Sequence, residues 1–169
     1  MSDVPSLKSR LEVAANIAVL VAVVAILAFM GQQEYERHHS VQPSQATLVG
    51  KTITLPGVHF APQSKTLILA ISTTCHFCKD SEPFYQQLAA RNRGPIKIVA
   101  VLPQPLAEAR SYVQKSIAPS VEVVSSQLDS IGVRGTPTVL LVDGNGKVQQ
   151  AWFGKLSDQG QQQVQSLLM

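Results

Sequence analysis

The first pattern along the chain is a long apolar run, VAANIAVLVAVVAILAFM, at residues 13–30. With Leu11 it approaches the roughly 20 apolar residues that a helix needs to cross a bilayer. Asn16 is its one polar residue, whereas a buried helix of a globular domain shows polar positions at helical spacing. A cleaved signal peptide has a shorter apolar segment that ends in small residues. The pattern therefore predicts an uncleaved signal-anchor, a transmembrane helix over residues 11–31.

Charges on the two sides of this run predict its orientation. Lys8 and Arg10 precede it, and two glutamates with a single arginine follow it. Because cytoplasmic flanks carry the excess of Lys and Arg, residues 1–10 are expected to stay in the cytoplasm. We therefore expect a single-pass protein of the bacterial inner membrane, with its C-terminal part on the periplasmic or extracytoplasmic side. Disulfides form and persist in that compartment.

Residues 32–47 are polar and Gln-rich, without hydrophobic periodicity, and predict a linker. His38 and His39 lie in it. Neighbouring histidines in a polar linker are far more often solvated than metal-bound, because a metal site needs further ligands in fixed geometry. The linker leads into a domain predicted over residues 48–169.

Apolar runs alternate with helical patterns through this domain. A buried strand at 66–71, a helix at 75–91 and a strand at 96–102 form a βαβ unit. The elements predicted after it are a helix at 105–116, a short strand at 121–124, strands at 138–142 and 148–153 joined by an Asp143–Gly146 hairpin turn, and a last helix capped by Ser157 and reaching Leu168. The pattern predicts an α/β domain with a central mixed sheet flanked by helices.

The chain has two cysteines, Cys75 and Cys78, at the junction of the first strand and its helix. Thr73 or Thr74 could cap that helix. A helix N-terminus favours a thiolate, so the pKa of Cys75 should be lowered, whereas Cys78 lies one turn further in and is shielded. The spacing therefore predicts a redox pair, with Cys75 as the attacking thiol and Cys78 as the resolving thiol.

Other uses of a Cys-x-x-Cys pair fit this chain less well. Tetrahedral zinc needs four ligands, and no second cysteine pair follows, so His59 or His76 would complete a site only by coincidence. Covalent haem needs His directly after the second cysteine, where Lys79 stands. A structural disulfide stays open, although a bridge across so short a loop constrains the unfolded chain little. We predict no metal and no cofactor.

Charge adds one exclusion. The formal net charge is +3, and the basic residues form no block interleaved with aromatic residues. Nucleic-acid recognition leaves a clustered basic footprint, so we expect no nucleic-acid partner.

The segment Cys75–Lys79 (CHFCK), followed by Pro83, resembles the active-site helix of thioredoxins with its helix-kinking proline. The segment Val133–Asp143 (VRGTPTVLLVD) resembles the stretch that carries the thioredoxin cis-proline. The helix and short strand between Pro105 and Val124 are similar to the insertion of the membrane-anchored, TlpA-like thioredoxins, which also have an N-terminal anchor. The resemblance spans roughly residues 48–168.

The resemblance implies a thioredoxin fold with a cis Thr136–Pro137 bond beside the cysteine pair, where the backbone binds an extended substrate chain. It implies a thiol–disulfide oxidoreductase that acts on exported cysteine-containing proteins, as a reductant by analogy with the anchored relatives. A membrane thiol–disulfide reductase or oxidase would reset the pair.

Departures from the family leave the direction of electron flow open. Many thioredoxins have an acidic residue where this chain has Leu69, and Thr74 replaces the usual Trp before the first cysteine. The spacer His76-Phe77 matches neither common reductants nor strong oxidants; a protonated His76 would stabilise the Cys75 thiolate and favour oxidising behaviour. Asp80 and Glu82 could accept a proton from Cys78. Their spacing along the helix does not establish whether either carboxylate faces the cysteine pair.

Three other functions remain as alternatives. The first is a disulfide-donating oxidase. The second is a thiol peroxidase, whose Pro-x-x-x-Thr/Ser-x-x-Cys site would need proline at Ile68, although Ser72 fits. The third is a non-enzymatic copper-binding or thiol-binding module that uses Cys75, Cys78 and His59.

Overall fold

A computed structural model describes residues 16–29, 48–94 and 96–168. The chain divides into two units, Met1–Val41 and Gln42–Met169, and each is considered by itself. The predictions for residues 1–10 and 32–47, with His38 and His39, lie outside the described residues.

In the first unit, residues 16–29 form a helix whose apolar side chains are exposed, for example Leu20 and Leu27 at 65% and 63%. Among the described residues, no helix combines the length and apolar character required to cross a membrane. The rest of the predicted segment, at 11–15 and 30–31, is not described. The transmembrane helix over 11–31 thus stays a prediction.

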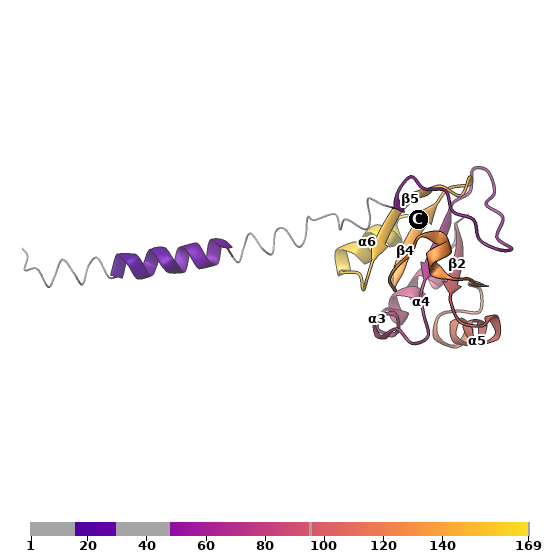
Figure 1. The fold of residues 1–169 in the computed structure, drawn as a ribbon, viewed down its shortest axis with the longest axis horizontal. Coiled ribbons are helices and arrows are strands. Elements are labelled where there is room, and N and C mark those ends of the chain that lie inside the picture. The colour runs from indigo at the N-terminus through magenta and orange to yellow at the C-terminus, as the bar shows by residue number, and fades with distance from the viewer. Residues whose placement is uncertain (1–15, 30–47, 95, 169) are drawn as a thin grey trace, which may run out of the picture. The chain divides into compact units, whose positions relative to one another are not determined.

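In the second unit, five strands form one mixed sheet (Figure 1) in the order β3-β2-β1-β4-β5. The strands are β1 (Thr66–Ala70), β2 (Lys97–Leu102), β3 (Glu122–Ser125), β4 (Thr138–Val142) and β5 (Val148–Phe153). Strands β1, β2 and β3 are parallel neighbours, whereas β4 is antiparallel to both β1 and β5. Every residue of β1 and β4 is buried, as expected of central strands covered on both faces.

Helices pack on one face of this sheet. They are α3 (His76–Asp80), α4 (Glu82–Arg91), α5 (Leu106–Ser116) and α6 (Asp158–Ser166). The connections β1 to β2 and β2 to β3 step in the same direction across the sheet, so right-handed crossovers place their helices on the same side. Leu88 of α4, Val113 of α5 and Val164 of α6 accordingly share one buried cluster with Leu67 and Leu69.

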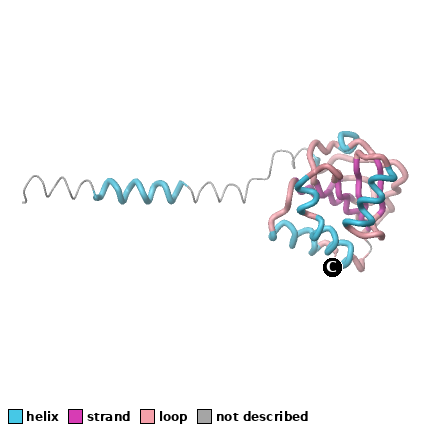
Figure 2. Tube along the Cα trace, turned by 90° about the horizontal axis from the view of Figure 1, so that it is seen from below, coloured by secondary structure: helices cyan, strands magenta, loops and turns pink. Residues whose placement is uncertain are grey.

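Loops cover the opposite face, and Figure 2 shows loop segments running along the strands. The N-terminal segment packs against this opposite face of β1 and β4 through Ile53, Leu55 and Val58. The 3-10 helix η1 (Leu128–Ile131) packs there too, through Ile131. The Gly50 and Ile53 N–H groups donate to the carbonyls of Val148 and Gly146, both at 2.8 Å. The segment is thereby fixed beside β5.

The helix predicted over residues 75–91 is broken, so that prediction is wrong in one respect. Helix α3 ends and α4 begins at Ser81, whose hydroxyl donates to the Phe77 carbonyl at 2.8 Å. Pro83 explains the break, since its ring clashes with the carbonyl four residues earlier and it has no N–H to donate.

The other predicted elements are present, with ends shifted by a residue or two. The Asp143–Gly146 hairpin turn is confirmed: Asp143 Oδ1 accepts from the N–H groups of Asn145 and Lys147, and Gly146 has the positive φ (79°) that such a turn requires. Ser157 caps α6 by accepting from the Gly160 N–H. Helix η1 was not predicted.

Candidate active site

The two cysteines lie where β1 has ended, at the start of α3. The helix is capped by Cys75 itself: its Sγ accepts a hydrogen bond from the Cys78 N–H at 3.2 Å. The prediction that Thr73 or Thr74 supplies the cap is wrong. Thr73 instead donates to Glu108 Oε1 of α5 at 2.8 Å, and the Thr74 hydroxyl is engaged with Ser72 at 3.1 Å. The capping atom is therefore the reactive sulfur.

Cys75 is a free, half-buried thiol whose surroundings favour ionisation. Partial burial raises its pKa, but hydrogen bonding to the Cys78 thiol and to Thr136, with the N–H groups of Cys78 and Phe77, outweighs that cost. The pKa of Cys75 consequently lies below its ordinary value, and a thiolate is the attacking species in disulfide exchange.

Cys78 is a free thiol with no exposed surface. Burial, and then its hydrogen bond to Cys75, raise the pKa of Cys78 to about 12, while the Ser72 N–H and Thr136 act in the opposite sense. Cys78 therefore stays protonated near neutral pH. Two cysteines three positions apart thus differ in access and in charge, as attack and resolution require.

A loop from a distant part of the chain completes the site. The Thr136–Pro137 peptide bond is cis, the geometry that the family resemblance implies. The Thr136 carbonyl accepts from the Cys75 Sγ–H at 3.4 Å. On each side of this contact the loop is held: Thr138 Oγ1 donates to the Gly135 carbonyl, and the Gly154 N–H donates to the Pro137 carbonyl, both at 2.7 Å. The role of Thr136 and Pro137 in substrate binding stays a prediction.

The spacer residues both face solvent. The His76 side chain is 80% exposed and Phe77 is 55% exposed, and their rings meet edge to face with centroids 5.8 Å apart. His76 Nε2 lies 3.8 Å from Asp80 Oδ2, and Lys155 Nζ lies 3.1 Å from the same oxygen. A carboxylate already paired with Lys155 therefore stands beside His76.

Around Cys78 the side chains are apolar or neutral. Leu69, at the position where many thioredoxins have an acid, is fully buried in the same cluster as Cys78. Burial raises the pKa of Tyr85 and of Tyr112, so both phenols stay protonated. Glu82 accepts a hydrogen bond from the Tyr112 hydroxyl at 2.8 Å. Its carboxylate is therefore engaged with α5.

Sequence reasoning missed a polar network that supports the cysteine loop. Ser72 Oγ accepts from Gln104 Nε2 at 2.8 Å and lies 3.1 Å from Thr74 Oγ1. Ser125 Oγ of β3 donates to the Gln104 carbonyl at 2.7 Å. The network joins the residues that follow β1 and β2, and no local motif marks it because Ser72 and Gln104 lie 32 positions apart.

Throughout the described ranges, no three His, Cys, Asp or Glu side chains gather closely enough to hold a metal ion. His59 is exposed on the N-terminal segment that covers the opposite face of the sheet. The structure therefore does not bring His59 together with the cysteines.

No protein-family model matches this chain, and no curated protein matches it. Solved structures do match. MTB dsbF aligns with a TM-score of 0.52 at 19% identity, over 64% of this chain and 83% of its own. A protein from Chlorobium tepidum assigned as the thiol:disulfide interchange protein DsbE gives 0.52 at 20%, over 70% and 96%. StoA from Bacillus subtilis gives 0.51 at 17%, over 62% and 82%.

The second unit has a thioredoxin fold. The fold predicted for the domain is thus confirmed, with its mixed sheet and flanking helices. In this thioredoxin fold the cysteine loop follows β1 and the cis-proline loop precedes β4, so the antiparallel pairing of β1 with β4 brings the two loops to the same edge of the sheet. The kinship with anchored, TlpA-like thioredoxins stays a prediction.

Proposed function

We propose that this protein is a membrane-anchored thiol–disulfide oxidoreductase that reduces disulfides of exported proteins. The observation that carries the proposal is the contrast within the pair: Cys75 is accessible with a lowered pKa, and Cys78 is buried and protonated one helical turn away. The fold of the domain supports it, since the similar solved structures include thiol:disulfide interchange proteins.

The chemistry uses the two cysteines in sequence. The Cys75 thiolate attacks one sulfur of a substrate disulfide, an S–S bond forms between them, and the other substrate sulfur leaves as a thiolate. Cys78 then loses its proton and attacks Cys75 Sγ. The Cys75–Cys78 disulfide forms, and the first substrate sulfur leaves and takes up a proton. Counted from the Cys75 thiolate, the pair gives up two electrons and the proton of Cys78, solvent supplies the second proton, and the substrate disulfide becomes two thiols.

Two features favour the reducing direction. A very low pKa of the attacking thiol stabilises the reduced pair and makes a strong oxidant. Here the groups that lower the pKa of Cys75 are neutral hydrogen-bond donors, and the only ionisable side chain of the spacer, His76, is 80% exposed, so solvent screens any charge on it. The pair is therefore expected to be reducing, like thioredoxin.

Anchoring and partners complete the proposal. The apolar run at residues 13–30 supports an anchor, and the exposed apolar side chains of residues 16–29 are consistent with it. The partners would be exported proteins that carry cysteines, and a membrane thiol–disulfide reductase that returns the Cys75–Cys78 disulfide to the dithiol.

Trapping of mixed disulfides tests the function. The Cys78→Ser variant of the full-length protein has no resolving thiol. Cys75 should therefore stay bound to substrate proteins as mixed disulfides, which dithiothreitol should reduce. The matched control is Cys75→Ser, which should form none. Absence of adducts with Cys78→Ser, combined with tight Cu(I) binding by the unmodified protein, would contradict the proposal and favour a copper-binding module.

A further inference from the structure

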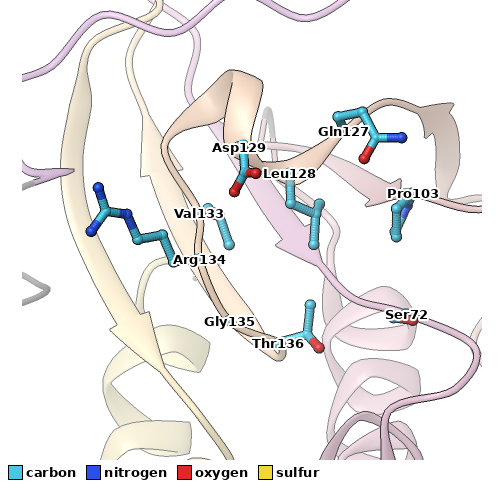
Figure 3. A pocket seen from close by; sticks show the side chains of 9 residues that line it. All are labelled: Ser72, Pro103, Gln127, Leu128, Asp129, Val133, Arg134, Gly135 and Thr136. Carbon is cyan, nitrogen blue, oxygen red and sulfur yellow. The ribbon is translucent and has the colours of Figure 1, made fainter.

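Charge is distributed unequally between the two ends of the strands. The cysteine edge is the one where β1, β2 and β5 end and β4 begins. Figure 3 shows Asp129 and Arg134 at this edge, lining a pocket, and Lys155 is paired there with Asp80 of α3. Of the seven acidic residues between 48 and 168, five lie at the cysteine edge: Asp80, Glu82, Glu108, Asp129 and Asp158. They are accompanied by three basic residues, Lys79, Arg134 and Lys155.

Basic residues gather at the opposite edge, where β1 and β2 begin and β4 is joined to β5. The Lys97 N–H donates to the Lys65 carbonyl at 3.1 Å, so these two lysines lie side by side at the strand starts. Across the sheet, Lys147 is bridged to Thr52, and the Val148 N–H donates to the Lys51 carbonyl at 2.9 Å. The fold thus collects five exposed residues that are scattered along the sequence, here called the distal basic edge: Lys51, Lys65, Arg93, Lys97 and Lys147.

The distal basic edge is a broad row with a net positive charge. Neighbouring strands are about 4.8 Å apart, so the row extends roughly 19 Å from β2 across β1, β4 and β5 to the N-terminal segment. Two carboxylates lie in it: Glu122 pairs with Lys97, and Asp143 accepts from two backbone N–H groups and from Gln149. Five cations and two carboxylates leave a charge of +3, whereas three cations and five carboxylates give −2 at the cysteine edge.

The chemistry of this row suits an extended anionic surface. Four of its five cations are lysines, which act as compact point charges on flexible stems rather than as planar forks that grip one carboxylate or phosphate. Each Lys or Arg close to an anionic membrane strengthens binding roughly fivefold. The proposed anchor would keep the domain near the bilayer, so a modest attraction would be enough to orient it.

We propose that the distal basic edge binds the surface of a membrane that contains anionic phospholipids and thereby turns the cysteine edge away from the bilayer. The inference rests on the anchoring in the proposed function. The two edges act in the same sense, because an anionic surface attracts one and repels the other. The attraction is screened by salt and exchanges quickly, so the cysteine edge can still turn toward a membrane reductase.

Acetylation of lysines tests the proposal without altering the protein. The full-length protein would be placed in nanodiscs of phosphatidylcholine, with or without 30% phosphatidylglycerol, and treated briefly with the uncharged N-acetoxysuccinimide. Mass spectrometry gives the rate at each lysine. Lys51, Lys65 and Lys147 should react at least roughly threefold more slowly in the anionic discs, and 0.5 M NaCl should abolish the difference. Lys79 and Lys155 serve as internal controls and should change less than about 1.5-fold.

Two matched variants locate the attraction. Lys51→Gln/Lys147→Gln removes two exposed charges from the distal basic edge, which should weaken the attraction roughly 25-fold. The protection of Lys65 and Lys97 by the anionic lipid should then fall below about 1.5-fold. Lys79→Gln/Lys155→Gln removes the same charge from the cysteine edge and should leave that protection in place.

The outcomes separate this inference from the function on which it rests. Equal acetylation of the distal lysines in both kinds of disc, with the protein still bound to the discs, overturns the inference and leaves the proposed function standing. Equal protection of lysines at both edges, or protection that persists in Lys51→Gln/Lys147→Gln, also overturns it. Failure of the full-length protein to co-elute with discs of either lipid overturns the anchoring and this inference together.

Discussion

Cys75 and Cys78 are separated by one turn of backbone and have contrasting surroundings. Around Cys75 there are N–H donors, a carbonyl of the cis-proline loop and open solvent. Around Cys78 there are apolar side chains of β1 and α4 and two protonated phenols. Burial and hydrogen bonding therefore give two identical side chains different pKa values, in opposite directions from the ordinary one.

This contrast explains the order of the reaction. The accessible sulfur is the one that can be a thiolate and meet substrate, whereas the buried sulfur can be reached only from Cys75. A change that equalises the two environments should therefore erase the order.

Selective alkylation should show the largest effect. At pH 7.5, iodoacetamide should modify Cys75 of the reduced protein at least roughly hundredfold faster than Cys78, because only the thiolate reacts and the pKa of Cys78 is about 12. Since the pKa of Cys75 is lowered, its rate should rise with pH and level off below the pH at which an ordinary cysteine does. Peptide mapping by mass spectrometry measures both rates. Comparable rates at the two cysteines would contradict the assignment of roles.

Placing an acid beside the buried thiol should have the next largest effect. Leu69→Asp puts a carboxylate in a fully buried position, which should lower the free energy of unfolding by roughly 3–5 kcal/mol. It should also shorten the lifetime of the mixed disulfide, because a base near Cys78 accelerates its deprotonation. Urea denaturation and stopped-flow kinetics measure the two effects.

Two controls separate these effects. Leu67→Asp, on the same strand and equally buried, should lose similar stability without changing the lifetime of the mixed disulfide. Leu69→Asn adds polar atoms at the same place without a base and should also leave the lifetime unchanged. A lifetime that Leu69→Asp does not alter would mean that proton removal from Cys78 does not limit resolution.

The smallest effect concerns the hydrogen bond that joins α4 to α5. Tyr112→Phe removes the 2.8 Å bond to Glu82 and should lower the free energy of unfolding by about 1 kcal/mol, measured in urea. Glu82→Gln keeps an acceptor and should lose less. The alkylation rate of Cys75 should stay within about twofold in both, since neither residue contacts its sulfur; a larger change would connect this pair to the site.

Patterns within the chain were sufficient to predict most of the fold. The apolar runs of β1, β2 and β4 and the Asp143–Gly146 turn are local signals. A short, continuous apolar run bounded by turn residues is typical of a strand buried on both faces, as β1 and β4 are. The break at Ser81 has a local cause, Pro83, but the hydroxyl that holds it depends on the folded helix. The residues at which helices and strands end are therefore harder to predict than the presence of the helices and strands themselves.

The parts of the site that could not be predicted depend on contacts between distant segments. The Thr136 carbonyl reaches Cys75 across 61 positions, and Gln104 reaches Ser72 across 32. The family resemblance indicated the first contact, whereas nothing in the sequence marked the second. A pocket lined by Ser72, Pro103 and residues of the segment 127–136 has the same origin, because only the folded sheet brings these three segments together.

The reduction potential of the Cys75–Cys78 pair tests the central claim most directly. The full-length protein would be equilibrated in detergent with dithiothreitol or glutathione buffers, and the thiol content of the two cysteines would be measured by alkylation and mass spectrometry. The account predicts a reversible two-electron couple near or below the value of thioredoxin, about −270 mV. A value near −120 mV would contradict the reducing direction, and failure of the two cysteines to form a reversible disulfide would contradict the exchange mechanism itself.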